Sequence, residues 1–104
     1  MKDIKSLAVL DSILDGEKLV LIDFYSDSCS DCKTMHVLLE LISKDYQSEV
    51  EVVQVNVERG EEIVNEFKVQ KLPALFFVKE RRFMEKLSGL QSLRYLRERV
   101  EVLK

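Results

Sequence analysis

The fold of this protein is decided by one stretch of its sequence, LVLIDFYSDSCSDCK at residues 19–33. Residues 19–25 form an apolar run, rich in branched and aromatic side chains and interrupted only by Asp23, that predicts a strand buried on both faces. The cysteines follow this strand, and a helical pattern begins at Ser30. The stretch therefore predicts a buried strand that leads into a helix, with a Cys-x-x-Cys motif where the two elements meet.

Strand and helix patterns alternate through the rest of the chain. Apolar residues at helical spacing predict helices over residues 6–15, 30–46 and 60–67, and a last helix with the stripe Leu93, Leu96, Val100 and Leu103. Apolar or alternating runs predict strands over residues 50–57 and 74–78, a turn over 79–82 with a return strand over 83–87, and a short edge strand over 3–5. The order predicts a three-layer α/β/α fold, in which a central mixed sheet of four to five strands is sandwiched between helices.

Length, composition and charge limit the class of protein. At 104 residues the chain is long enough for a single domain spanning residues 1–104 and too short for two. A formal charge of −3 argues against nucleic acid as a partner, and no apolar run approaches the ~20 residues that cross a bilayer. Residues 1–5 lack the apolar segment of a secretory signal. We therefore expect a cytoplasmic, monomeric protein that binds neither nucleic acid nor membrane.

The only cysteines in the chain, Cys29 and Cys32, lie in one tetrapeptide, so they predict chemistry at one place and not a disulfide scaffold. The start of a helix offers free N–H groups and a partial positive charge, which stabilise a thiolate. Cys29, at the cap position, is the expected nucleophile in thiol–disulfide exchange, and Cys32, one turn inward, is expected to resolve the mixed disulfide. A purely structural bridge is less favoured because a reducing cytoplasm would not preserve it.

Three features elsewhere in the chain strengthen the motif. Asp23 lies one strand-length before the cysteines, where burial would raise its pKa and let it exchange protons with Cys32 through water. The alternative for Asp23 is a buried acid satisfied only by backbone donors. Pro73 opens a core strand, and a cis bond there would turn the Leu72 backbone toward the cysteines. Gly89, after the hairpin, leaves room for an approaching peptide.

Together these landmarks resemble the thioredoxin family along essentially the whole chain. They are Asp23-Phe24, the Cys-x-x-Cys-Lys motif, Leu72-Pro73-Ala74 and Gly89. The resemblance implies a thioredoxin fold and a thiol–disulfide oxidoreductase that reduces protein disulfides. It also implies disulfide-containing protein substrates, no cofactor beyond the redox-active disulfide, and a thioredoxin-reductase-type flavoprotein as electron donor.

The family's residue roles carry over to matching positions of this chain. By this resemblance Cys29 is the nucleophile, Cys32 the resolving cysteine and Asp23 the buried acid. A cis-proline is implied at Pro73, and the shallow substrate groove is lined by Ser28, Leu72 and Gly89.

The motif departs from the family's usual Trp-Cys-Gly-Pro-Cys-Lys. Ser28 replaces the tryptophan, which removes an apolar contact surface for substrates. Ser30 and Asp31 replace the central pair, and the charge of Asp31 disfavours a nearby thiolate, whereas Lys33 and the helix terminus oppose that effect. Gln54 stands where a lysine often neighbours the buried acid, which favours the protonated carboxyl. We expect these residues to tune the redox chemistry.

Two other classes of function stay open. A dedicated redox carrier or weak oxidant for one partner would share the fold and the cysteine pair. Cys29, Cys32 and His36 could share one face at the start of the helix, although three ligands fall short of the four of a structural zinc site. A dimer that bridges two cysteine pairs could hold zinc or an iron–sulfur cluster. We instead expect no metal site, with His36 a lone residue on the helix flank and Arg81 part of a solvated turn.

Overall fold

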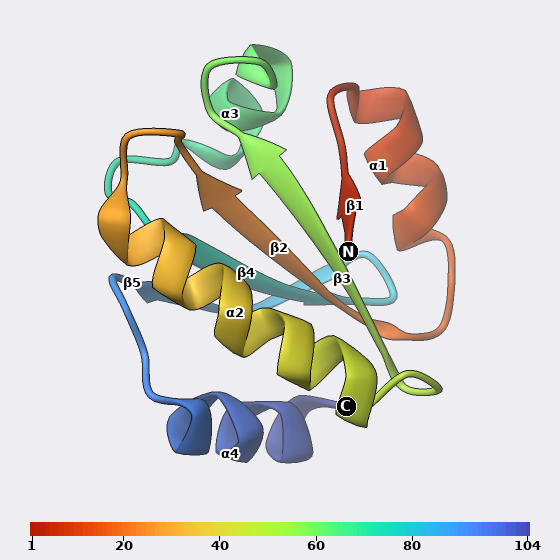
Figure 1. Ribbon diagram of the computed structural model, residues 1–104. Helices are drawn as coiled ribbons and strands as arrows, with labels where there is room; N and C mark the ends of the chain where they lie inside the picture. Colours follow the sequence, from red (N-terminus) through yellow and green to blue (C-terminus); the bar gives the residue numbers. More distant parts are fainter.

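Figure 1 shows the computed structural model of the protein, which describes residues 1–104 and contains one five-stranded sheet between two pairs of helices. The strands are β1 (Lys2–Asp3), β2 (Leu19–Tyr25), β3 (Val50–Asn56), β4 (Ala74–Lys79) and β5 (Arg82–Ser88). The helices are α1 (Leu7–Leu14), α2 (Ser30–Asp45), α3 (Glu61–Phe67) and α4 (Leu93–Leu103). The mixed α/β/α architecture predicted from the sequence is confirmed.

Strand β2 lies at the centre of the sheet, whose order is β1-β3-β2-β4-β5. It pairs in parallel with β3 on one side and antiparallel with β4 on the other, and the β4–β5 hairpin forms one edge. Parallel strands need a crossover connection, which α2 supplies between β2 and β3. The site-bearing segment between β2 and α2 therefore starts from the most enclosed strand of the molecule.

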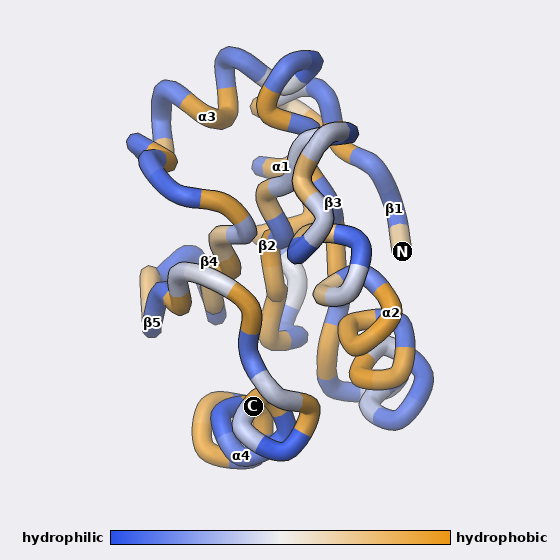
Figure 2. Tube along the Cα trace, turned by 60° about the vertical axis from the view of Figure 1, so that its left-hand side comes forward, coloured by the Kyte–Doolittle hydropathy of each residue, from blue (hydrophilic) through white to orange (hydrophobic).

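Alternation along the strands creates one apolar core on each face of the sheet. Val20, Ile22 and Phe24 of β2 pack in the core that includes residues of α1 and α3. Leu19 and Leu21 pack in the other core, with residues of α2 and α4. Figure 2 shows the result: the central strands are largely hydrophobic, whereas the helices carry hydrophobic and hydrophilic stretches in alternation. Each helix thus buries one stripe against the sheet.

The limits of several elements differ from the sequence predictions by one or two residues. Ser6 lies outside α1 as its N-cap, because its hydroxyl accepts a hydrogen bond from the Val9 N–H. The edge strand covers Lys2–Asp3 and not residues 3–5, and Ile4, which follows it, lies in the core and is 1% exposed. No helix has both the length and the apolar character needed to cross a membrane.

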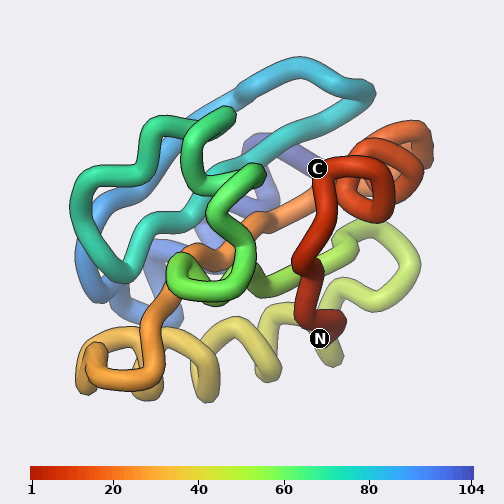
Figure 3. The backbone as a smooth tube through the Cα atoms, turned by 90° about the horizontal axis from the view of Figure 1, so that it is seen from above, coloured from red at the N-terminus to blue at the C-terminus, as the bar shows by residue number.

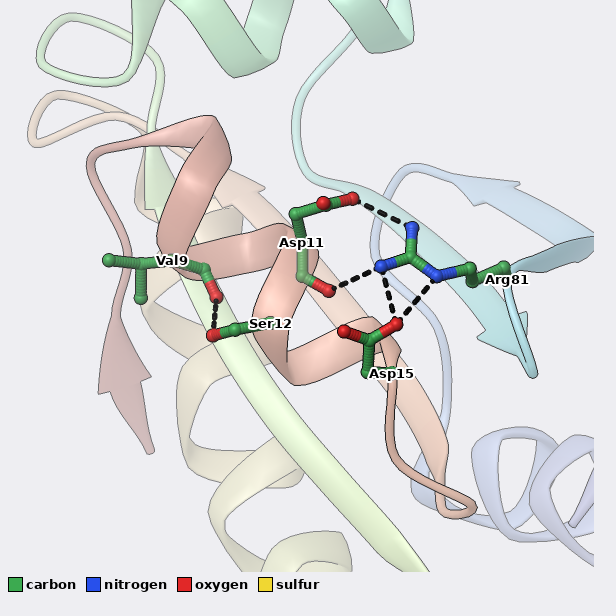
Figure 4. Close-up of polar contacts among 5 residues, drawn as sticks. All are labelled: Val9, Asp11, Ser12, Asp15 and Arg81. Carbon is green, nitrogen blue, oxygen red and sulfur yellow. Dashed lines mark hydrogen bonds and ion pairs between the residues drawn. The ribbon is translucent and has the colours of Figure 1, made fainter.

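The β4–β5 turn lies beside α1, at the end of the molecule opposite to the start of α2 (Figures 1 and 3). Glu80 and Arg81 have φ values of 50° and 66°, the left-handed conformation used by two-residue hairpin turns. The Arg81 guanidinium donates to the carboxylates of Asp11 at 2.7 Å and Asp15 at 2.6 Å (Figure 4). Arg81 lies in an exposed turn, as the sequence predicted, and the turn also brings it against two exposed carboxylates, Asp11 of α1 and Asp15 at the C-cap of that helix.

Candidate active site

A disulfide joins Cys29 and Cys32 where the β2–α2 connection enters α2. Cys29 is the N-cap of the helix, and its Sγ accepts a hydrogen bond from the Cys32 N–H at 3.2 Å. Cys29 is half-buried, whereas Cys32 is only 3% exposed. The outer sulfur therefore sits at the positive end of a sixteen-residue helix, where free N–H groups favour a thiolate, and the inner sulfur is shielded from solvent.

The residues around the disulfide are exposed on the rim of the site. Ser28 precedes the N-cap, and its hydroxyl lies 3.5 Å from that of Ser26. Ser30, Asp31 and Lys33 belong to the first turn of α2, and all three are exposed. A carboxylate in the first turn is itself favoured by the helix dipole, so Asp31 brings a negative charge close to the sulfurs without breaking the helix.

The segments that carry Pro73 and Gly89 reach the same end of the sheet as the disulfide. Ala74, the first residue of β4, pairs with Phe24 near the end of β2, and also with Ser88 at the end of β5. The Gly89 N–H donates to the Pro73 carbonyl at 2.8 Å, and the Leu72–Pro73 bond is cis, as the sequence predicted. Figures 1 and 3 both show the segment before β4 next to the start of α2.

Glycine is required at position 89 by its backbone conformation. Its φ of +87° is a value that side-chain-bearing residues rarely adopt. The space around it is open, because a Cβ added there would meet only the Lys71 Nζ, at 4.0 Å. The sequence prediction of free room at Gly89 agrees with this geometry, although the conformation and not the room alone explains the residue type.

Asp23 is a fully buried acid on the α2 side of the sheet. Alternation along β2 directs it to the face of Leu19 and Leu21, the face that α2 covers. Burial raises the pKa of Asp23 to about 7, and a hydrogen bond from Gln54 opposes that rise. The Gln54 Nε2 lies 3.4 Å from the Asp23 Oδ2, and the Oδ1 has no partner. Asp23 thus changes protonation near neutral pH, as the sequence led us to expect.

One part of the site was not found from the sequence. His36 is not a lone residue: its Nδ1 lies 2.8 Å from the Gln54 Nε2, and its Nε2 lies 3.2 Å from the Glu40 Oε1. The spacing of four residues between Cys32, His36 and Glu40, which aligns side chains along one flank of a helix, is the signal that could have indicated it. The contact with Gln54 joins α2 with β3, so it could not be predicted from the sequence of either segment.

A cavity of about 260 Å³ lies beside this group of residues. Its lining residues come from the end of β2, the start of α2 and β3, and they are Tyr25, Ser26, Asp27, Cys32, Lys33, His36 and Gln54. The cavity therefore gives water a route from the surface to the buried cysteine and to the side chain that contacts Asp23. No group of three or more histidine, cysteine and acidic side chains in the chain is arranged to hold a metal ion.

Fold and site together define a class of protein, an α/β domain with a half-buried cysteine of a disulfide at a helix N-terminus and a buried acid of raised pKa on the central strand. The thioredoxin family model matches residues 5–102. The chain is 30% identical over 98 residues to thioredoxin of Mycoplasmoides gallisepticum, covering 94% of this chain and 97% of that protein. It is 38% identical over 80 residues to Thioredoxin-T of Drosophila melanogaster, which covers 77% of this chain and 51% of that longer protein.

The fold gives the same result. Thioredoxin of Fasciola hepatica superimposes with a TM-score of 0.92 at 25% identity, covering 100% of both chains. This chain belongs to the thioredoxin family. Its activity is thiol–disulfide oxidoreduction, and family membership implies that its substrates are proteins that contain disulfides.

Proposed function

We propose that Cys29 is the nucleophile and Cys32 the resolving cysteine of a protein-disulfide reductase. The Cys29 thiolate attacks a substrate disulfide, forms a Cys29–substrate disulfide and expels the first substrate sulfur as a thiolate. Cys32 loses its proton to Asp23 and attacks the Cys29 Sγ, which releases the second substrate sulfur. The cysteine pair is oxidised to the disulfide by two electrons, and the substrate takes up those electrons with two protons.

The observation that carries this proposal is the unequal environment of the two sulfurs. Cys29 caps the helix and is half-buried, and Cys32 is 3% exposed. A bulky substrate disulfide can approach the first sulfur and not the second. The second is suited to an intramolecular attack, which needs a base, and Asp23 with its pKa of about 7 exists in both protonation states near neutral pH.

The substrate groove of the proposal runs over Ser28, Leu72, Pro73 and Gly89. Gly89 lacks a side chain, so backbone groups beside the disulfide can approach a bound peptide closely, and Pro73 has no N–H to donate to that peptide. With Ser28 in place of a large aromatic residue, the groove binds substrate more through backbone hydrogen bonds than through apolar contact.

We further propose that Ser30, Asp31 and Lys33 set the redox potential of the cysteine pair. Asp31 is exposed in the first turn of α2, and its charge disfavours the thiolate of the reduced form. A less stable reduced form makes the couple a stronger reductant, the reverse of what an oxidant needs. The charge of Asp31 supports reduction of substrates over the alternative of a weak oxidant for one partner, whereas Lys33 and the helix terminus act in the opposite direction.

The remaining parts of the proposal concern the cellular setting. A dithiol that works as a reductant suits the reducing cytoplasm, and a thioredoxin-reductase-type flavoprotein would return its electrons. The redox-active disulfide is the only redox group required, so no further cofactor is proposed. The net charge of −3 does not favour nucleic acid. We propose that residues 1–104 act as one monomeric domain.

The test is the reduction of insulin with dithiothreitol as electron source, for the wild-type protein and for Cys29→Ser and Cys32→Ser. We expect both variants to fall to the rate of dithiothreitol alone. Equal rates for wild type and Cys29→Ser would contradict the proposal. The reduction potential of the Cys29–Cys32 pair shows in which direction electrons flow. A value at or below roughly −270 mV fits a reductant, and one near −120 mV would identify an oxidant.

A further inference from the structure

We propose that His36 is a positioning residue for Asp23: it fixes the Gln54 side-chain amide so that an N–H group, and not the carbonyl oxygen, faces the buried carboxylate. The structural part of this inference stands on the contacts of His36. Its consequence for the reaction rests on the proposed function, in which Asp23 takes the proton of Cys32.

The hydrogen bonds around His36 form a chain with one consistent direction. Glu40 is a carboxylate, so the His36 Nε2 that lies 3.2 Å from it carries the proton. When the ring carries its single proton on the Nε2, its Nδ1 is an acceptor. It takes a hydrogen bond from the Gln54 Nε2 at 2.8 Å, which leaves the second N–H of the same amide for Asp23 at 3.4 Å. Glu40 on the surface of α2 thus fixes, through His36, which group of the Gln54 amide faces Asp23.

The opposite orientation of the Gln54 amide would reverse its effect on Asp23. A flipped amide would direct its oxygen at both the His36 Nδ1 and the carboxylate, an acceptor facing two acceptors. An ionised Asp23 would then have no donor at all, because Gln54 is the only side chain that forms a hydrogen bond with it. Gln54 is 8% exposed and Asp23 is 0% exposed, so water gives little compensation for the lost donor.

The position of Gln54 explains why a surface histidine can act on a buried acid. Gln54 and His36 both line the 260 Å³ cavity beside Cys32, whereas Asp23 does not, so Gln54 lies between the acid and the solvent. The charged or titratable groups around His36 are Glu40 and Lys33 on α2, Asp27 and Tyr25 across the cavity, and Cys32. None of these contacts Asp23 by a hydrogen bond, which leaves Gln54 as the path.

The first experiment measures the pKa of Asp23 by carboxyl 13C NMR across a pH series, in the disulfide form so that no thiol titrates. His36→Ala removes the acceptor and frees the amide. We expect the pKa of Asp23 to rise by about half a unit, because the donated hydrogen bond favours the ionised form. His36→Asn keeps an acceptor at the Nδ1 position without a titrating ring, and we expect it to restore the wild-type pKa.

A second comparison separates positioning from direct charge. In a Gln54→Leu background the amide is absent, and His36→Ala should then produce no further shift. An equal shift in both backgrounds, no shift from His36→Ala in the wild-type background, or a His36→Asn variant that behaves like His36→Ala would each overturn the proposal. Amide NMR spectra of all variants, compared with wild type, establish that each is folded before its titration is interpreted.

The consequence for the reaction is read separately from the pKa. The acidic limb of the pH profile of insulin reduction should move upward with His36→Ala by the same half unit, about a threefold loss of rate on that limb. If the pKa of Asp23 shifts and the pH profile does not, His36 positions Gln54 as inferred, and it is the role of Asp23 in the proposed function that fails.

Discussion

Replacement of Asp23 by asparagine should stabilise the protein at alkaline pH and not at acidic pH. Burial raises the pKa of Asp23 from 3.8 to about 7. The folded protein therefore holds this proton more tightly than the unfolded chain does. Asp23 contributes most favourably below pH 3.8, and that contribution is lost as the pH rises through 7, where the buried carboxyl must ionise.

The size of the effect follows from the pKa change. A rise from 3.8 to about 7 is roughly 3 units, and at 1.36 kcal/mol per unit it costs about 4 kcal/mol once Asp23 is fully ionised. Asparagine does not titrate, so the free energy of unfolding of Asp23→Asn relative to wild type should increase by about 4 kcal/mol between pH 4 and pH 8. The asparagine N–H groups at the unpartnered Oδ1 position subtract a constant ~1–3 kcal/mol at every pH.

The assay is urea unfolding of the disulfide forms at a series of pH values, analysed by linear extrapolation. Glu17→Gln, at an exposed position, controls for the loss of one carboxylate from the surface. The pH dependence of Asp23→Asn is compared with that of this exposed-site variant, and it should be the larger of the two. A constant difference between Asp23→Asn and wild type would refute the reasoning, because it would mean that Asp23 is not desolvated in the folded protein.

Three further predictions concern a buried leucine of α2, the ion pairs of Arg81 with Asp11 and Asp15, and the charge of Asp31. Leu39→Ala, at a fully buried position of α2, should lower the free energy of unfolding by about 2–5 kcal/mol in urea, and Leu38→Ala, at a half-buried position of the same helix, by less. Arg81→Ala should lower the thermal midpoint, and this loss should shrink in 1 M salt because the ion pairs with α1 are exposed. Asp31→Asn should move the pH midpoint of Cys29 alkylation downward, and an upward shift would show that Asp31 does not act by charge.

The fold could be predicted because the sequence is locally consistent. The apolar run at residues 19–25 fixed β2 to the residue, and the periodicity after Ser30 fixed α2 to within one residue. Only three glycines and one proline interrupt the chain, which leaves few places for irregular structure. The predicted elements differ from the structure mainly at their ends: Ser6 is the N-cap of α1 and not part of it, and Ile4 lies outside β1. Element ends are hard to predict because capping and core contacts depend on tertiary neighbours.

The site could be predicted only where its residues follow one another or match a known motif. Asp23, the cysteines, Pro73 and Gly89 were identified in this way, and strand register explains why they share one end of the sheet. The contact of Gln54 with His36 joins residues eighteen positions apart on different elements, and nothing in either segment indicates the other. The same holds for Arg81 and its partners on α1, 66 and 70 positions away.

The central claim is that Cys29 is the nucleophile and Cys32 the resolving cysteine. It is tested most directly by trapping the mixed disulfide. Reduced Cys32→Ser is mixed with insulin, quenched with acid and digested, and the linked peptides are identified by mass spectrometry. We expect a covalent adduct on the peptide that contains Cys29, persistent because no resolving thiol remains, and none on Cys32 in the Cys29→Ser variant. Equal accumulation of a Cys32 adduct in Cys29→Ser, or no adduct in either variant, would contradict the mechanism.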